Sequence, residues 1–336
     1  MKTRFVIGTR GSRLALIQAR SVIDRLSKLH PDFKFELKKV TTSGDKQTTA
    51  PLDQLQGVGF FVKEIEGELR NGTVDLAVHS LKDLPTELPA GLALGAVGKR
   101  ADVRDVLIYR DAAYLRAAEA DNAAAEWSPG QSARRGFKPG LAVKNLPAGA
   151  VVATSSTRRK AQLLTLNPGL KVPDIRGNVV TRLQKVAERA ELDATVLALA
   201  GLTRLNFRIT PEGRLEGDAV PDGLLATILD TEVMLPCVGQ GAVGIEVRES
   251  DERIAAICER LNHFNTRQCV IAERAFLAGM GGGCQSPVAA YAEVVGKQLK
   301  MRALSFASGP VRRAQARRPI KEALELGQQL AAELKG

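Results

Sequence analysis

Aromatic side chains are scarce in this 336-residue chain: Phe, Trp and Tyr together make up 4% of it, and tryptophan occurs once. Proteins that bind single-stranded nucleic acid stack its bases on aromatic side chains, so the scarcity argues against such a surface. No zinc-finger or RNP-type motif is present, and the basic residues are not confined to one tract. The net charge of +11 still favours an anionic partner, and a polyanionic small molecule competes with nucleic acid for that place.

Long apolar stretches are also missing, because no run in the sequence reaches the length that a membrane-spanning helix needs. Arg10 and Arg13 interrupt the place where the apolar core of a signal peptide would lie, so a cytoplasmic location is expected. With 44% hydrophobic and 25% charged residues, the composition is that of an ordinary globular protein. A length of 336 residues favours two or three domains over one.

Metal-ligand and disulfide patterns are absent as well. Four cysteines without a CxxC pair, together with only three histidines, argue against a structural zinc site and a disulfide scaffold. Cys258 and Cys269 fall on apolar helical faces and are expected to be core thiols, whereas Cys237 follows a proline and stays ambiguous. Cys284 differs from these, because three glycines precede it and Pro287 follows. Such a loop presents a thiol rather than burying it.

What the sequence does contain is an alternation of short apolar strands with amphipathic helices, which favours an α/β fold with mostly parallel sheets. Ser12 is expected to cap the first helix, and Pro31 to end it. Residues 111–149 show no period and are expected to form an inserted, partly mobile segment. Strands are expected at 4–8, 35–42, 74–80, 150–154, 193–200, 289–295 and 299–306, and helices at 12–29, 61–70, 156–166, 178–190 and 320–334.

Arginines recur at one kind of position, between the end of a strand and the start of the next helix. Ligands of open α/β sheets bind outside the carboxyl ends of the strands, where helix N-termini supply free N–H groups. A single arginine there can simply be solvated, but the recurrence predicts a cationic crevice in which guanidiniums bind carboxylates or phosphates. Its expected members are Arg10, Arg158, Arg159, Arg176, Arg182 and Arg204, with hydroxyls from Ser12, Ser155 and Ser156.

Asp83 is the one carboxylate that the sequence places among these arginines, at the end of the apolar strand 74–80 and next to Lys82. Taken alone, Asp83 is as readily a helix N-cap as a catalyst. Within a cationic site it becomes the candidate general acid/base and the group that stabilises a substrate cation. His79 ends the same strand and is interpreted as a satisfied core histidine rather than as a competitor.

Segments in order along nearly the whole chain resemble the porphobilinogen deaminase (hydroxymethylbilane synthase) family. They are GTRGSRLALIQA, TTSGDK, FFVKEIE, DLAVHSLKDLP, TSSTRRKAQL, IRGNVVTRL, LALAGLTRL, LPCVGQGAVGIEVR and AERAFLAGMGGGCQSPVAAYAE. The resemblance implies two periplasmic-binding-protein-like (type II) α/β domains and a small C-terminal α+β domain. The expected boundaries are 1–102 with 236–260 for the first domain, 103–235 for the second and 261–336 for the third.

The resemblance also implies a transferase of haem biosynthesis. It condenses four porphobilinogen molecules stepwise, with release of ammonia, onto a dipyrromethane cofactor, and water then releases hydroxymethylbilane. The catalytic carboxylate would be Asp83, and the thioether to the cofactor would form at Cys284. Neither a metal, a nucleic acid nor a membrane is expected as a partner, and a monomer is expected. Cofactor contacts are implied for Lys82, Ser12, Arg158, Arg159, Ser156 and Arg182, and substrate contacts for Arg10, Arg176, Arg182 and Phe61.

The chain departs from the family's pattern in a few places. Val58 stands where the lid segment commonly has a lysine, which puts one contact to a substrate carboxylate in doubt. Segments 111–149 and 206–232 are longer than the usual connections. Two alternative functions compete with this one. The first is a non-enzymatic anion-binding protein on the same fold, which would not need Cys284, and the second is a nucleic-acid-binding protein, which would not explain Asp83.

Overall fold

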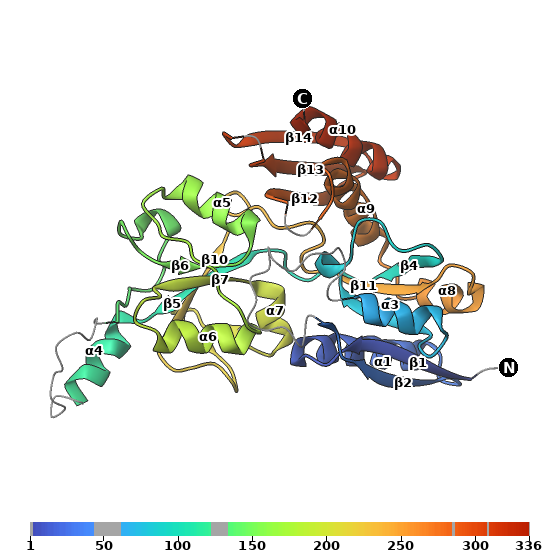
Figure 1. Ribbon diagram of the computed structural model, residues 1–336, viewed down its shortest axis with the longest axis horizontal. Helices are drawn as coiled ribbons and strands as arrows, with labels where there is room; N and C mark the ends of the chain where they lie inside the picture. Colours follow the sequence, from blue (N-terminus) through green and yellow to red (C-terminus); the bar gives the residue numbers. More distant parts are fainter. Residues whose placement is uncertain (1–2, 44–61, 122–133, 284–285, 308, 336) are drawn as a thin grey trace. The chain divides into compact units, whose positions relative to one another are not determined.

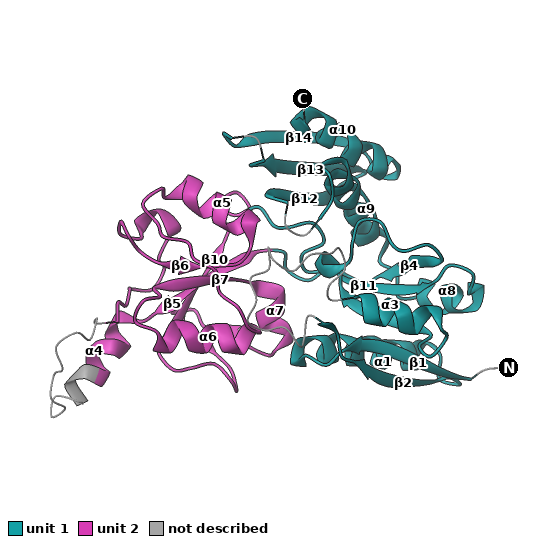
Figure 2. Ribbon diagram, in the orientation of Figure 1, with its two compact units in different colours: residues 1–103, 235–336 teal, residues 104–234 magenta. Residues whose placement is uncertain are grey.

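The computed structural model describes residues 3–43, 62–121, 134–283, 286–307 and 309–335 (Figure 1). These residues form two compact units, shown in Figure 2: residues 1–103 with 235–336, and residues 104–234. The first unit is therefore built from both ends of the chain. Among the described helices, none is both long and apolar enough to span a lipid bilayer.

The first unit holds a five-stranded sheet in the order β2-β1-β3-β11-β4, in which β11 runs antiparallel to both of its neighbours. Helices α1 and α8 pack on one face through an apolar cluster that includes Phe5, Leu26 and Ile254, and α3 packs on the other face. The bounds are β1 Arg4–Arg10, α1 Arg13–Leu29, β2 Lys34–Val40, α3 Lys63–Arg70, β3 Leu76–Ser80, η1 Leu81–Asp83, β4 Leu92–Val97, β11 Val243–Arg248 and α8 Glu252–Glu259.

The same unit ends in an antiparallel sheet, β12-β13-β14, whose inner face is covered by α9 and α10. Its core joins Phe276 of α9, Leu330 of α10 and Met301 of β13, none of which is exposed to solvent. This part carries the expected small α+β architecture. The bounds are α9 Phe264–Gly279, β12 Val288–Val295, β13 Gln298–Ser305, β14 Arg312–Pro319, η3 Ile320–Glu322 and α10 Ala323–Lys335.

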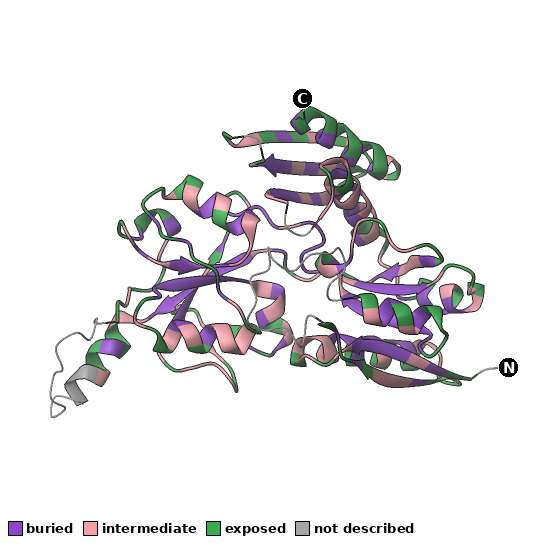
Figure 3. Cartoon of the chain, in the orientation of Figure 1, coloured by how far each residue is buried: buried purple, intermediate pink, exposed green. Residues whose placement is uncertain are grey.

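The second unit is built on a four-stranded sheet in the order β10-β5-β7-β6. Helix α5 covers one face through Leu163, and α6 packs on β5 and β7. Figure 3 shows that the strands are buried while the outer faces of the helices are exposed. The bounds are β5 Asp105–Arg110, α4 Ala112–Asp121, η2 Val143–Asn145, β6 Val152–Ala153, α5 Thr157–Leu166, α6 Val179–Glu188, β7 Ala194–Ala198, α7 Leu199–Arg204, β8 Arg208–Ile209, β9 Leu215–Glu216 and β10 Leu224–Leu229.

These sheets confirm the predicted fold class of two α/β sheets plus a small C-terminal α+β part. The three-domain boundaries given above stay a prediction. One expectation is wrong in part: residues 134–149 do not behave as an insertion, because Val143 and Leu146 are buried in the same core as Leu163. This packing could not be predicted from the sequence, because a 3-10 turn that buries single apolar side chains shows neither the period of a helix nor that of a strand.

Candidate active site

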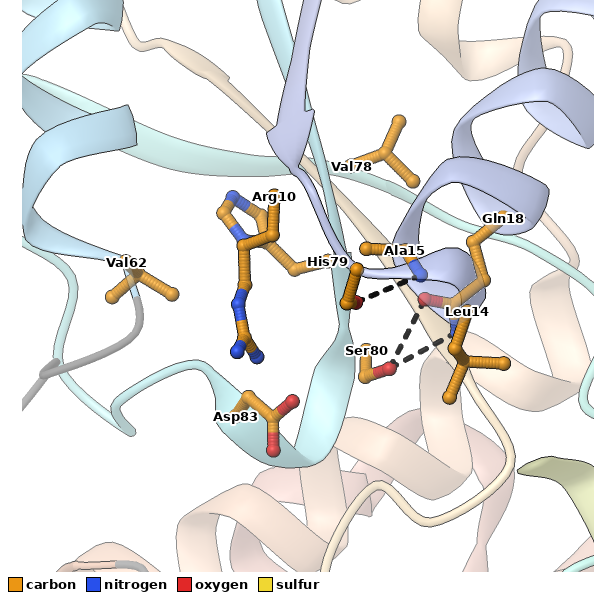
Figure 4. Close-up of a pocket in the computed structure, with 10 residues that line it drawn as sticks. Arg10, Leu14, Ala15, Gln18, Val62, Val78, His79, Ser80 and Asp83 are labelled. Carbon is orange, nitrogen blue, oxygen red and sulfur yellow. Dashed lines mark hydrogen bonds between the residues drawn. The ribbon is translucent and has the colours of Figure 1, made fainter. Parts of the chain in front are cut away.

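A pocket of about 60 Å³ lies in the first unit, where β1 and β3 end. The two strands are parallel neighbours in the sheet, so the residues that follow them meet at one edge. The pocket is lined by Arg10, Ser12, Leu14, Ala15, Gln18, Val62, Val78, His79, Ser80 and Asp83, most of which Figure 4 labels.

Asp83 and Arg10 lie in this pocket as the sequence predicts, and in Figure 4 the guanidinium of Arg10 extends toward the Asp83 carboxylate. Arg10 is the last residue of β1, and Asp83 ends the short 3-10 turn that follows β3. Both side chains are half-buried, while Lys82 beside them is exposed. The pair offers a carboxylate for proton transfer and a guanidinium for an anion at one end of one sheet.

Ser12 has the capping role that the sequence predicts, because its Oγ accepts a hydrogen bond from the backbone N–H of Ala15 at 3.3 Å. The adjoining wall contains a pair that sequence reasoning missed. Gln18 Nε2 donates to Ser80 Oγ at 3.0 Å, and the Ser80 hydroxyl lies 3.1 Å from Gln18 Oε1. Gln18 is buried on the inner face of α1. A polar residue on this otherwise apolar face is the sequence feature that could have indicated such a hydrogen bond.

His79 is buried, but it is not the satisfied core histidine that was expected. Its Nε2 lies 3.1 Å from a carboxylate oxygen of Glu246 on the adjacent strand β11. Among the described residues, neither His79 Nε2 nor either oxygen of Glu246 has an aligned hydrogen bond, so the two groups are close without being hydrogen-bonded. The sequence feature that could have indicated this contact is a charged residue, Glu246, inside the otherwise mostly apolar strand Val243–Arg248.

The second unit carries a buried cluster of arginines with a carboxylate of its own. Arg158 Nη2 and Arg159 Nη2 each donate to one oxygen of Asp105, both at 2.7 Å, and all three residues are buried. Although burial acts to raise it, the two guanidiniums hold the pKa of Asp105 well below its ordinary value. The prediction that Asp83 is the one carboxylate among the arginines is therefore wrong. Asp105 opens β5 and pairs with Ala198 at the end of β7, which sets it against the start of α5.

Arg182 and Arg176 belong to the same unit and surround the start of α6. Gly177 has a φ of 112°, a conformation that favours glycine, and its carbonyl accepts a hydrogen bond from Arg182 Nε at 2.8 Å. Burial, and after it the guanidiniums of Arg159 and Arg176, lowers the pKa of Arg182 to about 10. Such crowding of positive charge indicates a place where a bound anion would be favourable.

Ser156 caps α5 by accepting a hydrogen bond from the N–H of Arg159 at 3.4 Å. Ser155 instead bridges to the next segment, donating to the carbonyl of Ile175 at 2.9 Å. Arg204 ends α7 and is half-buried. Arg10 belongs to the first unit and the other arginines to the second, so the convergence of all of them on one crevice stays a prediction.

The loop before Cys284 has an unusual backbone: Gly281, Gly282 and Gly283 have φ values of 97°, 55° and 140°. Three successive residues in this region need glycine, which explains the glycine run. Cys284, Phe61 and Val58 lie outside the described residues. Cys258 and Cys269 are buried as expected, and burial raises the pKa of each thiol to about 12. Both are therefore poor nucleophiles.

Residues for a carboxylate-bearing cofactor are present in the second unit. Arg159 Nε is buried and has no hydrogen-bond acceptor among the described residues, and burial beside the guanidiniums of Arg159 and Arg176 lowers the pKa of Arg182. A dipyrromethane carries carboxylate side chains, so this donor set fits it. Within the described ranges, no group of three or more His, Cys, Asp or Glu side chains could hold a metal ion.

Comparison with known proteins gives two family matches that together cover most of the chain. The model described as "Porphobilinogen deaminase, dipyromethane cofactor binding domain" matches residues 5–256, and the porphobilinogen deaminase C-terminal domain matches residues 267–336. The porphobilinogen deaminase of Roseiflexus sp. is 39% identical over 99% of this chain and 96% of that protein. The one from Geobacillus kaustophilus is 42% identical over 89% of this chain and 83% of that protein.

Among solved structures, substrate-binding domain 2 of Lactococcus lactis GlnP is 9% identical and covers 77% of this chain and 88% of that domain. Its TM-score of 0.38 is too low to support a statement about fold or ligand.

Proposed function

Because this chain belongs to the porphobilinogen deaminase family, we propose that Asp83, Arg10 and the arginines of the second unit carry out that family's reaction here. The chain is a transferase of tetrapyrrole biosynthesis that uses a dipyrromethane cofactor. It joins four porphobilinogen units with loss of ammonia, and water releases hydroxymethylbilane. The alternative of a non-enzymatic anion-binding protein is set aside, because the family consists of enzymes.

The observation that carries the assignment of the catalytic residue is the pocket at the ends of β1 and β3. It brings a half-buried carboxylate, Asp83, together with a guanidinium, Arg10. Porphobilinogen carries an acetate and a propionate next to a basic aminomethyl group. A guanidinium for a carboxylate and a carboxylate for a developing cation are the two groups that such a substrate needs.

Asp83 would act on the charge and the proton of each condensation. Loss of ammonia from the aminomethyl carbon leaves a cation on the pyrrole, which a carboxylate close to the pyrrole N–H stabilises. A new carbon–carbon bond then forms at that methylene, and the attacking pyrrole loses the proton from its α-carbon. Asp83 accepts this proton, as a positioned general base. Arg10 meanwhile holds a substrate carboxylate, with the Ser12 hydroxyl beside it.

Arginines of the second unit would hold the carboxylates of the cofactor and the growing product. Arg159 has a buried Nε without an acceptor among the described residues, and Arg182 lies close to other guanidiniums. Arg176 lies in the loop before α6. Arg158 contributes through the pair that it makes with Asp105, which fixes the cluster's shape. A planar guanidinium binds a carboxylate through two parallel hydrogen bonds, and this selects acids over neutral ligands.

Cys284 would carry the cofactor. When attached, the dipyrromethane supplies the pyrrole carbon that attacks the first incoming substrate. The glycine loop from Gly281 to Gly283 lets the backbone approach neighbouring groups closely, because it has no side chains. The other described thiols fit this role less well, since Cys258 and Cys269 are buried and Cys237 Sγ donates to Gln240 Oε1 at 3.3 Å.

We further propose that the protein works as a cytoplasmic monomer without nucleic acid or membrane partners. We also keep the division into domains at 1–102 with 236–260, 103–235 and 261–336 as a proposal. The high net charge of +11 serves a polyanionic product in this view rather than a nucleic acid.

The experiment that tests the assignment is the intact mass of the purified protein beside its Cys284→Ser and Cys237→Ser variants. A surplus of one dipyrromethane is expected on the parent and on Cys237→Ser, and none on Cys284→Ser, because a hydroxyl is a far weaker nucleophile than a thiolate. A parent without the surplus after incubation with porphobilinogen would refute the cofactor chemistry. A surplus retained by Cys284→Ser would refute the attachment site.

A further inference from the structure

A buried histidine beside a buried glutamate adjoins the pocket and has no role in the reaction described above. His79 lines the pocket together with Asp83, and its Nε2 lies 3.1 Å from Glu246. The side chains of His79 and Glu246 are 2% and 0% exposed. Taking a carboxylate out of water costs several kcal/mol of free energy. A neighbouring imidazole offsets this cost only when good hydrogen bonds satisfy both groups.

Those hydrogen bonds are missing, which makes a purely structural role a poor explanation. Both oxygens of Glu246 and the Nε2 of His79 are buried without an aligned hydrogen bond among the described residues. Buried polar groups are nearly always satisfied, and exceptions concentrate at functional sites. A carboxylate next to the imidazole of a residue that lines a reaction pocket is an arrangement that can hold a histidine for proton transfer.

The strand pairing fixes this arrangement. His79 of β3 lies opposite Gly244 of β11, and Glu246 lies two residues further along β11. Side chains two residues apart share one face of a sheet, so the imidazole and the carboxylate project from the face that α3 covers. Because both belong to the central strands of the sheet, the pair is held by backbone ladders on each side.

A second buried carboxylate, Glu66 of α3, belongs to the same cluster. Burial, and after it the Glu246 carboxylate, raises the pKa of Glu66 above its ordinary value. This upward direction disposes Glu66 to keep its proton more readily than an exposed glutamate does. Among the described residues, other charged groups near the cluster include Lys63 and Arg70 of α3, Arg10 of β1, and Asp83.

We propose that His79, oriented by Glu246, is a positioning residue that receives from Asp83 the proton released in each condensation. The inference rests on the proposed function of Asp83. In each cycle the carbon–nitrogen bond of the substrate ammonium breaks with its electron pair on nitrogen, and ammonia leaves. The attacking pyrrole forms the carbon–carbon bond and gives its α-proton to Asp83. His79 takes this proton from Asp83 and gives it to the released ammonia, which becomes ammonium, so that Asp83 is again a carboxylate for the next cycle.

The pocket that His79 and Asp83 both line has room for water, and water can connect two groups that are not in direct contact. A neutral imidazole is the form that accepts the proton, so activity should fall as the pH drops and the imidazole becomes charged. In Glu246→Gln the imidazole loses the carboxylate beside it, and we expect this acidic fall in activity to lie at lower pH than in the parent.

The test compares five purified holoenzymes: the parent, Asp83→Asn, His79→Gln, Glu246→Gln and Glu66→Gln. Each is checked for its cofactor by intact mass, for stability by urea unfolding, and for kcat and KM across the pH range in which it stays folded. His79→Gln should keep its cofactor and a KM within about twofold, lose at least about tenfold in kcat, and lose the acidic fall in activity. Glu246→Gln should move that fall to lower pH, and Glu66→Gln should match the parent.

The outcomes separate this proposal from the one on which it rests. A parent without turnover, or an active Asp83→Asn, would refute the function proposed for Asp83. With that function intact, the role of His79 is overturned if His79→Gln retains the parent's kcat and pH profile, or if it loses only stability. It is overturned equally if Glu66→Gln loses as much activity as Glu246→Gln. Should His79→Gln fail to fold, the pH profile of Glu246→Gln alone decides.

Discussion

A single guanidinium, that of Arg100, donates to both carboxylate oxygens of Glu273, at 2.6 and 3.0 Å. Arg100 follows β4 of the five-stranded sheet, whereas Glu273 lies on α9, against the C-terminal sheet. The same carboxylate also accepts hydrogen bonds from the N–H groups of Gly239 and Ala292, at 2.8 and 2.9 Å. Glu273 therefore links three parts of the first unit: the end of β4 through Arg100, the segment before β11 through Gly239, and β12 through Ala292.

Glu273→Ala should destabilise the first unit by about 3–5 kcal/mol, because a buried guanidinium loses its counter-charge and two backbone N–H groups lose their acceptor. The measurement is urea unfolding of the full chain. Glu322→Ala is the matched control, since Glu322 pairs with Arg318 at the surface and such pairs contribute at most about 1 kcal/mol. Equal losses of unfolding free energy in the two variants would show that the hydrogen bonds of Glu273 contribute no more than a surface ion pair does.

Asp105→Asn should destabilise the second unit by a similar amount, about 3–5 kcal/mol at neutral pH, because two buried guanidiniums lose their counter-charge. The pKa of Asp105 is lowered in the folded protein, so its contribution is present above the ordinary aspartate range. It is lost as the pH falls below that range toward the lowered pKa.

The gap in unfolding free energy between the parent and Asp105→Asn should therefore narrow on acidification. Urea unfolding at several pH values measures it, with Asp222→Asn, an exposed aspartate of the same unit, as the control. A gap that stays constant, or widens, as the pH falls would contradict the pairing of Asp105 with the two arginines.

Much of the first unit is predictable from the sequence, because its signals are local. Ser12 predicts the start of α1, Pro31 its end, and the apolar run before Ser80 predicts β3; all three are confirmed. The placement of Asp83 follows from the same reasoning, since a residue just after a parallel strand must lie at the carboxyl edge of the sheet.

Other parts depend on contacts between distant segments, which a single sequence does not reveal. Asp105 becomes the partner of Arg158 and Arg159 only because β5 pairs with β7, and Glu246 reaches His79 only through the pairing of β11 with β3. Strand β14 was not predicted either, because its arginine-rich sequence lacks the apolar character expected of a strand. Its apolar contribution comes from alanines at alternate positions, Ala314 among them.

Arg176→Ala should raise the KM for porphobilinogen, or stall elongation, by about 10- to 100-fold, because a charge-assisted contact to a carboxylate contributes about 1.5–3 kcal/mol. Arg176 is a cleaner test than Arg158, because removing Arg158 would also take away one of the two guanidiniums that balance the buried charge of Asp105. The control is Arg208→Ala, an exposed arginine of the same unit that pairs with Glu216. Kinetics unchanged in Arg176→Ala would remove it from the binding site.

Asp83→Asn should reduce tetrapyrrole formation by at least about 100-fold and leave stability within about 0.5 kcal/mol of the parent. The amide keeps the shape of the half-buried side chain but neither accepts the α-proton nor balances the substrate cation. Steady-state turnover with urea unfolding measures both quantities, and intact mass checks that the cofactor is attached. If turnover in Asp83→Asn is close to normal, the pocket beside Arg10 is not where the condensation takes place, and the reaction must depend on another carboxylate.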